Sequence, residues 1–209
     1  MECNVECTNF HLKSTYFYNV NHLAHFYLAG EDPNLSIGNY IADHVKGNKK
    51  DNYSPEIKRG IEMHRSIDHY TDTHPLVREN VGHIKPILGR YSSIALDVIY
   101  DYFLANNWNQ YSNQNLQEFS NNRYKLLESN YDTLPTNSQH FYHYMIRNNI
   151  LFNYQFQDRL ERVFFGMSTR TKFKSELHRG VEALLANHEV LEQNFSEFFN
   201  ELKTEFANW

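Results

Sequence analysis

Acid and imidazole side chains recur every four residues in two segments of the chain. His64, Asp68 and Asp72 form one series, and Asp97 and Asp101 form the other. At 3.6 residues per turn, an offset of four leaves two side chains about 40° apart, on one face of a helix. The second pair interrupts an apolar stretch, where a buried carboxylate needs a hydrogen-bond partner or a cation. The spacing therefore predicts helices that assemble a metal site, whereas the alternative is a set of solvated acids with contacts along their own helices.

The residue composition also favours helices. Eight Gly and five Pro in 209 residues are too few for the turns of a many-stranded fold, while fifteen Tyr and fifteen Phe supply apolar area for a core. A chain of this length fits one domain. The formal net charge of −5 and the pI near 6.2 argue against a general nucleic-acid binder. Because no apolar run is long enough to span a bilayer and no secretory signal precedes the folded part, we expect a soluble cytoplasmic protein without a membrane partner.

The hydrophobic pattern divides the chain into two parts. Residues 1–19 show no clear period, contain both cysteines and are expected to form an N-terminal extension. From Val20 onward the pattern is helical, and turn signals separate the segments. We predict a single all-α domain of seven to nine helices over residues 20–209, without a disulfide framework. The expected helices cover residues 20–29, 35–45, 55–73, 76–88, 93–107 (capped by Ser92 and Ser93), 116–127, 138–152, 155–165 and 175–206, the last with Gly180 as a point of interruption.

Several motifs follow one another in a characteristic order. They are NHLAHFYLA (21–29), GNYIADHVKG (38–47), GIEMHRSID (60–68) with TD (71–72), LDVIYDYFL (96–104) with Trp108, and GMSTR (166–170). Together they resemble the acyl carrier protein phosphodiesterase family over the chain from about Val20 to its C-terminus. The resemblance implies a helical fold distantly related to the HD-type metal phosphohydrolases. It also implies a hydrolase that uses manganese to cleave the phosphodiester between 4′-phosphopantetheine and a serine of holo-acyl carrier protein, which yields the apo-protein.

The same resemblance implies a set of site residues. The expected ligands of a divalent metal, with manganese preferred, are His25, Asp43, His64, Asp68 and Asp101, and Asp72 and Asp97 are expected to orient ligands from behind them. Mixed imidazole and carboxylate donors suit manganese, iron or zinc better than magnesium. A bound metal polarises the phosphoryl oxygen and lowers the pKa of a water molecule. Without the resemblance, Asp43 is more simply a turn residue at the end of a helix.

Basic residues near this region suggest roles in binding the substrate. Arg65 is either a bidentate phosphate ligand or an exposed helix arginine. Four further cations are expected to dock a very acidic partner such as acyl carrier protein, namely Lys46, Lys58, Arg59 and Arg78. For the adjacent Lys49 and Lys50, a solvated turn is the simpler reading.

Two departures from the family pattern leave alternative functions open. Tyr102 stands where the family usually has histidine, and His22 replaces an apolar residue; His22, His44 or His69 are candidates to replace the missing histidine. One alternative is a metal phosphohydrolase for another small phosphodiester or a nucleotide. The other is a catalytically weak helical module that binds an acidic carrier protein without cleaving it.

Overall fold

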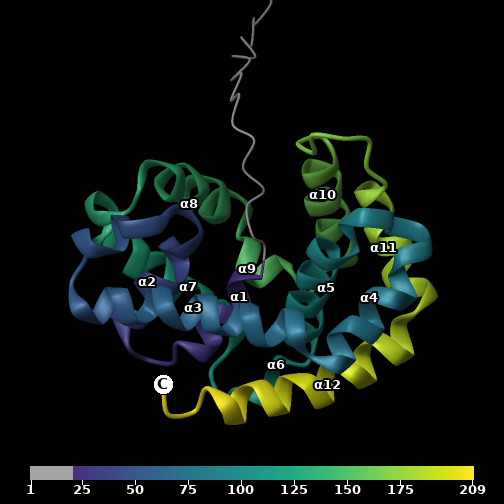
Figure 1. Ribbon diagram of the computed structural model, residues 1–209, viewed down its shortest axis with the longest axis horizontal. Helices are drawn as coiled ribbons and strands as arrows, with labels where there is room; N and C mark the ends of the chain where they lie inside the picture. Colours follow the sequence, from purple (N-terminus) through teal and green to yellow (C-terminus); the bar gives the residue numbers. More distant parts are fainter. Residues whose placement is uncertain (1–20) are drawn as a thin grey trace, which may run out of the picture.

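A computed structural model of the chain describes residues 21–209 (Figure 1). The expected extension and both cysteines lie outside these residues. Within residues 21–209 there are twelve α-helices and no strand, which confirms the all-α prediction. Eight of these helices are nine residues or longer, and the other four have seven residues or fewer, so the expected seven to nine matches the longer helices only.

The helices are named in chain order. Their bounds are α1 (His22–Leu28), α2 (Pro33–Ile41), α3 (Pro55–Thr73), α4 (Pro75–Leu88), α5 (Ser92–Asn106), α6 (Trp108–Tyr111), α7 (Leu116–Ser129), α8 (Thr136–Asn148), α9 (Ile150–Asn153), α10 (Gln157–Ser168), α11 (Gly180–Ala186) and α12 (His188–Glu205). Short 3-10 turns join some of them, namely η1 (Ala42–His44), η2 (Gly47–Asn52), η3 (Gly89–Tyr91), η4 (Tyr131–Thr133) and η5 (Leu177–Arg179).

Local signals explain where several helices begin. Asp32 accepts hydrogen bonds from the first backbone N–H groups of α2, and Ser54 does the same for α3 at its Ile57 N–H group, each just before a proline in the first turn. Ser92 differs from its predicted role as a cap, because α5 begins at this residue and its hydroxyl donates to the Gly89 carbonyl. The predicted helix over residues 175–206 is divided into α11, which begins at Gly180, and α12.

The α2 and α3 backbones touch through two glycines. A Cβ atom on Gly60 would lie 2.6 Å from the Leu35 carbonyl oxygen, and one on Gly38 would collide with the Ile57 carbonyl. Only glycine fits at these two positions, because any side chain would push the helices apart. The close approach holds the middle of α2 against the first two turns of α3, and η1 follows directly after α2.

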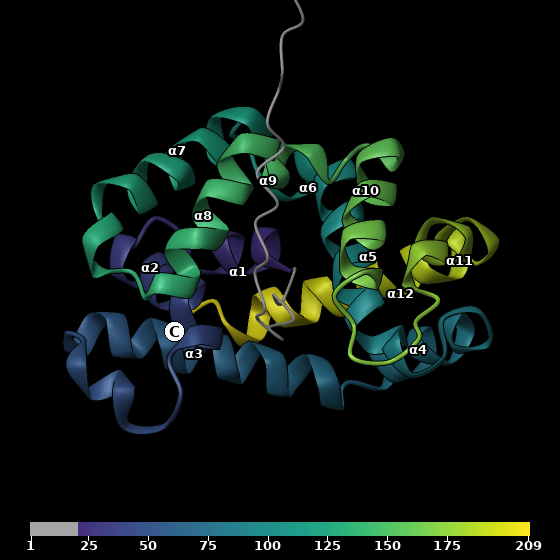
Figure 2. The ribbon, with the colours of Figure 1, turned by 90° about the horizontal axis from the view of Figure 1, so that it is seen from above.

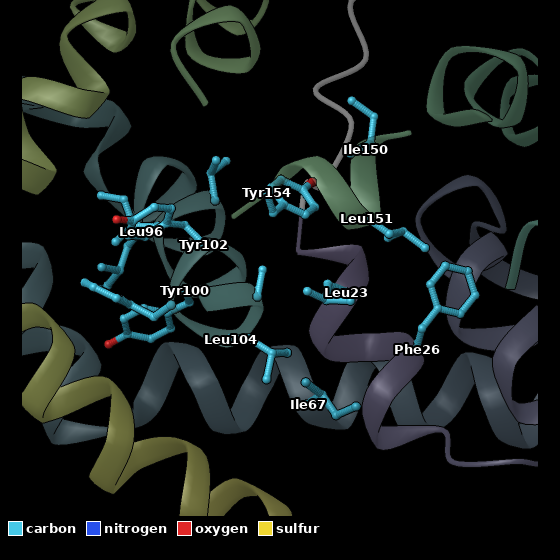
Figure 3. Close-up of a cluster of buried hydrophobic side chains, with 14 of the residues drawn as sticks. Leu23, Phe26, Ile67, Leu96, Tyr100, Tyr102, Leu104, Ile150, Leu151 and Tyr154 are labelled. Atoms are coloured by element: carbon cyan, nitrogen blue, oxygen red, sulfur yellow. The ribbon is translucent and has the colours of Figure 1, made fainter. Parts of the chain in front are cut away.

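The remaining helices enclose a core rich in aromatic side chains. In both views α8 and α10 lie on opposite sides of α9 (Figure 1; Figure 2). Figure 3 shows a central part of the core, in which Leu23 and Phe26 of α1 lie near Ile67 of α3 and Leu151 of the α9 turn. The apolar stripe on α12 is buried and belongs to this core, including Phe195, Phe198, Phe199, Leu202 and Phe206. Among the described helices, none combines the length and the apolar character that crossing a membrane requires.

Candidate metal centre

Two histidines and one aspartate meet where α1 faces α3. The Nε2 atom of His25 lies 3.3 Å from one carboxylate oxygen of Asp68, and the Nε2 atom of His64 lies 3.2 Å from the other. The two imidazole rings stack with their centroids 4.0 Å apart. One ligand atom from each of the three residues lies within 4.8 Å of the others, close enough for a single ion to contact all three. His64 and Asp68 share one face of α3, as their spacing predicts.

A buried asparagine fixes the orientation of His25. Its Nδ1 atom lies 3.0 Å from the side-chain oxygen of Asn39, and the Asn39 amide nitrogen donates to the Leu35 carbonyl at 3.0 Å. The second bond assigns the Asn39 oxygen to the side facing His25, so Nδ1 of His25 carries the proton and donates it. The Nε2 lone pair of His25 therefore points toward Asp68, as in a metal-ligating histidine held by a partner behind it. Sequence reasoning missed Asn39; its signal was a polar residue flanked by apolar positions on α2.

The buried nitrogens of this site fit a divalent ion. His25 and His64 are 1% and 2% exposed, and within the described part of the chain the Nε2 atom of each has no hydrogen-bond partner. A nitrogen lone pair that faces a carboxylate oxygen is unfavourable unless a proton or a cation lies between them. Two imidazole nitrogens with one or two carboxylates form a donor set that suits manganese, iron or zinc. The residues present therefore fit a metal centre.

Asp43 reaches the same centre from η1. Its carboxylate oxygen lies 3.4 Å from Nε2 of His64. The side chains of Asp43 and Asp68 are 27% and 31% exposed, whereas both histidines are buried. The open side of the centre is therefore lined by the two carboxylates, which are the groups that a ligand from solvent meets first.

The charges of these residues depend on one another. Burial lowers the pKa of His25, and the nearby His64 lowers it further. Burial also opposes the charged form of His64, but Asp43 and Asp68 outweigh it and raise the pKa of His64 to about 9. Despite their burial, the pKa of Asp43 and of Asp68 lies below its usual range because of the adjacent histidines. Both carboxylates are therefore ionised at neutral pH, and without a metal the proton of the cluster is on His64.

Asp101 occupies a different place from the three-residue group. It is fully buried, and its two carboxylate oxygens accept hydrogen bonds from the backbone N–H groups of Leu23 and Ala24, each at 2.9 Å. These N–H groups belong to the first turn of α1, where Asn21 supplies no side-chain cap. Burial raises the pKa of Asp101 well above its usual value, and the two N–H groups oppose that rise. Asp101 thus caps α1, the helix that carries His25, from a distant helix.

Asp97, Asp72 and Arg65 lie outside the three-residue group. Asp97 is half-buried on α5, and burial together with Asp68 and Asp72 raises its pKa well above the usual value. Asp72 is exposed at the end of α3. Arg65 donates a hydrogen bond to the Val45 carbonyl at 2.8 Å, which ties α3 to the segment after η1.

The four cations expected to dock a partner do not form one patch. Lys58 is paired with Asp51 at 3.0 Å. Arg78 bonds to the carbonyl of Asp72 near the end of α3. Asp72 lies thirteen residues beyond Arg59 on the same helix, or about 20 Å at 1.5 Å per residue. Arg78 is therefore remote from Lys58 and Arg59, while docking at Lys46, Lys58 and Arg59 stays a prediction.

The model of the acyl carrier protein phosphodiesterase family matches residues 20–202. The chain belongs to this family. A Yersinia enterocolitica protein named acyl carrier protein phosphodiesterase is 33% identical over 181 residues, which cover 86% of this chain and 94% of the relative. A relative with the same name from Escherichia coli is 34% identical over 184 residues, which cover 86% of this chain and 94% of the relative. One from Photorhabdus laumondii is 32% identical over 180 residues, which cover 86% of this chain and 87% of the relative. No solved structure matches the chain significantly, so the relation to HD-type phosphohydrolases stays a prediction.

Tyr102, which the sequence marks as a departure from the family pattern, contacts α10. The Tyr102 hydroxyl accepts a hydrogen bond from Gln157 of α10 at 3.4 Å. His44 is bonded to the Ser138 hydroxyl, and His69 is exposed on α3. His22 is buried among aromatic rings, and burial lowers its pKa to about 3, so it remains neutral. None of these three histidines belongs to the group formed by His25, His64 and Asp68.

Proposed function

We propose that this chain is a metal-dependent phosphodiesterase that removes 4′-phosphopantetheine from holo-acyl carrier protein and releases the apo-protein. Family membership supports the substrate and the reaction, since the relatives carry the name of this activity. One structural observation supports the metal: ligand atoms of His25, His64 and Asp68 lie within 4.8 Å of one another, and among the described residues the Nε2 lone pair of His25 faces the Asp68 carboxylate without a hydrogen-bond partner. We propose manganese as the ion, because two imidazoles with carboxylates favour it over magnesium.

The residues of the chain divide the work of such a reaction. When bound, the ion supplies a Lewis acid for the phosphoryl oxygen and lowers the pKa of a water molecule. We assign His25, His64, Asp68 and Asp43 to hold it. Asp43 and Asp68 line the open side and are ionised at neutral pH, so each can accept a hydrogen bond from the attacking water.

We assign the phosphate itself to Arg65. Its bond to the Val45 carbonyl uses one of five N–H donors of the guanidinium, which leaves others for phosphate oxygens. The same bond restrains the side chain, which reduces the entropy that is lost when phosphate binds. We propose that the charges of Asp72 and Asp97 help to orient the metal ligands. Asp101 is proposed to position His25 by capping α1.

A mass measurement tests the proposal. Holo-acyl carrier protein incubated with the chain and Mn²⁺ should lose the mass of one 4′-phosphopantetheine moiety, and the released moiety should carry the phosphate. The Asp68→Ala variant serves as the inactive control. If the carrier mass is unchanged with manganese, magnesium, iron and zinc in turn, the proposal is wrong.

The alternative of binding without cleavage rests on Tyr102, whose hydroxyl accepts a hydrogen bond from Gln157 of α10. Stoichiometric binding of the carrier protein without turnover would favour this alternative. The second alternative is a phosphohydrolase for other small phosphodiesters or nucleotides. Assaying the same preparation on such substrates without carrier protein distinguishes it from the proposed function. Turnover confined to these substrates would favour the general phosphohydrolase.

A further inference from the structure

An arginine-lined pocket lies between α8, α9 and α10, outside the metal centre. Its volume is about 190 Å³, and its lining contains Arg147 of α8 with Arg159 and Arg162 of α10. Among residues 21–209, the lining contains no aspartate or glutamate. The chain as a whole has a formal charge of −5, so three guanidinium groups around one pocket are a local concentration of positive charge on an acidic protein.

These arginines are available to an external anion. Within residues 21–209, Arg147 and Arg162 are exposed and form no ion pair. Arg159 pairs with its neighbour Asp158, at 3.4 Å and largely in solvent, which is a weak interaction. The distal family motif adds a fourth cation, because the guanidinium of Arg170 lies 5.6 Å from the ring centroid of Tyr144, a residue of the pocket lining.

The pocket is next to α1, the helix that carries His25, one of the assigned metal ligands. Tyr154, which follows α9, is 1% exposed and lines the pocket. It also lies near Leu23 in the first turn of α1 (Figure 3), and its hydroxyl interacts electrostatically with Asp101, the cap of that turn. The α9 turn with Tyr154 therefore separates the arginines from the helix on which His25 is placed.

We infer that this pocket receives carboxylate side chains of the acidic carrier protein. The inference rests on the proposed function, in which the bond to be cleaved joins phosphate to a serine of the carrier itself. The carrier surface must therefore come up to the metal centre, and the cations that hold it must lie around that centre. Guanidinium groups bind carboxylates bidentately, and a pocket of about 190 Å³ takes one or two acidic side chains, not a whole nucleotide.

Charge reversal of the two unpaired arginines tests the inference. The variant Arg147→Glu/Arg162→Glu changes only exposed side chains, so its circular dichroism should match that of the wild type. We expect KM for holo-acyl carrier protein to rise about tenfold or more with kcat nearly constant, because the change removes electrostatic steering and contacts to the carrier surface. Hydrolysis of bis(4-nitrophenyl) phosphate, which has no acidic protein surface, should stay near the wild-type rate.

Two matched variants make the result specific. Lys85→Glu/Lys125→Glu reverses two exposed cations on α4 and α7 that have no ion pair within the described residues, so KM should change little. Lys58→Glu/Arg59→Glu tests the docking residues expected from the sequence. The inference would be overturned if KM rose as much in the Lys85→Glu/Lys125→Glu control as in the arginine variant, or if it rose only in Lys58→Glu/Arg59→Glu. It would also be overturned if the arginine variant lost activity equally on holo-acyl carrier protein and on bis(4-nitrophenyl) phosphate.

Binding of the apo-carrier separates this inference from the proposed function. The dissociation constant of apo-acyl carrier protein, measured by calorimetry, requires no turnover. If the wild type binds it and the arginine variant binds about tenfold or more weakly, the pocket is the docking site even when no hydrolysis is detected. If hydrolysis proceeds but the arginine variant binds as tightly as the wild type, the docking site is elsewhere and the proposed function stands. If the wild type does not bind apo-carrier, the inference fails.

Discussion

The imidazole rings of His25 and His64 are stacked with an interplanar angle of 22° and share the carboxylate of Asp68. Two protonated rings at this distance would repel each other, so the pair holds one positive charge more readily than two. A divalent ion brings that positive charge without a proton. The stacked pair therefore links metal binding to pH.

Manganese affinity should rise with pH in the neutral to alkaline range. Because the pKa of His64 is raised to about 9, one proton must leave His64 before it ligates the ion. The affinity should increase about tenfold per pH unit below pH 9 and level off above it. Competition with a metal chelator between pH 6 and 10 measures this slope. The His22→Gln variant should keep the slope, since His22 has a pKa of about 3 and does not titrate there; a flat profile in the wild type would contradict the assignment.

The stability of the metal-free protein should depend on pH in two windows. The raised pKa of His64 stabilises the fold below the unfolded value of 6.5, and this contribution is lost as pH rises through about 9. The lowered pKa values of Asp43 and Asp68 stabilise it above the unfolded value of 3.8, and that contribution is lost as pH falls below it. Urea unfolding of chelator-treated protein should therefore show stability that falls as pH rises from about 7 to 9, and that falls again below about pH 4. Stability that still increases from pH 7 to 10 would exclude the charged cluster.

Removal of either carboxylate on the open side should abolish turnover. Asp43→Ala and Asp68→Ala each remove an anionic ligand, which weakens the ion and raises the pKa of its water, so we expect activity to fall by more than about 100-fold. Helical content by circular dichroism should be nearly unchanged, because both side chains are partly exposed. Metal bound per chain, measured by mass spectrometry after gel filtration, should fall with activity. Full activity in both variants would place the site elsewhere.

Loss of the Asn39 side chain should weaken the metal without touching a ligand. Asn39→Ala leaves Nδ1 of His25 without an acceptor, so the ring loses its fixed tautomer, and we expect a 10- to 100-fold weaker manganese affinity, roughly. Asn39→Asp keeps an acceptor oxygen but loses the bond to the Leu35 carbonyl, so it should retain more affinity than alanine. Equal affinities in wild type and Asn39→Ala would show that the ring is oriented by packing alone.

Asp101→Asn should distinguish a helix cap from a metal ligand. An amide offers one acceptor oxygen where the carboxylate serves two N–H groups, so unfolding without metal should become easier by about 1–3 kcal/mol. As a cap, Asp101 affects the metal only through α1, and most of the manganese affinity should remain. Unchanged metal-free stability together with lost manganese binding would favour the ligand role that the family resemblance implies.

A methyl group on Gly38 should destabilise the fold. The Cβ atom of Gly38→Ala would collide with the Ile57 carbonyl, which cannot rotate away, so we expect a loss of about 1–3 kcal/mol or more. Gly82→Ala is the matched control, because Gly82 lies within α4 with nothing within 4 Å of the added atom, and alanine should stabilise the helix there by about 0.5–1 kcal/mol. The two variants should move the urea midpoint in opposite directions; equal shifts would contradict the close approach of α2 and α3.

Local patterns predicted what lies on one helix and failed where two helices meet. The four-residue offset of His64 and Asp68 sufficed to place them together, because helix geometry alone fixes it. The periodicity of α5 indicated an inward carboxylate, but it could not show that Asp101 faces the first turn of a helix 77 residues away in the chain. The role of Asn39 was equally hidden, since it depends on the packing of α1 against α2.

Sequence alone could not show that Arg78 lies apart from the other expected docking residues, for a related reason. Arg78 is near the site residues in sequence, yet α3 carries the chain away from Lys58 before Arg78 is reached. The arginines of α8 and α10 are distant in sequence from His25 and His64, and they line one pocket because only the short α9 lies between their helices. Proximity along the chain predicts which side chains lie together within one helix, but it does not predict which residues of different helices lie together.

The contact between Gly38 and Gly60 has a consequence for the order of events in the cell. It sets the approach of η1 to α3 through main-chain atoms, which have no rotamers to search. The position of Asp43 opposite His64 is thus established when the chain folds, and little rearrangement is left for the moment of metal capture. The newly made protein can therefore reach its final shape first and acquire its ion later, at whatever pace the supply of free metal allows.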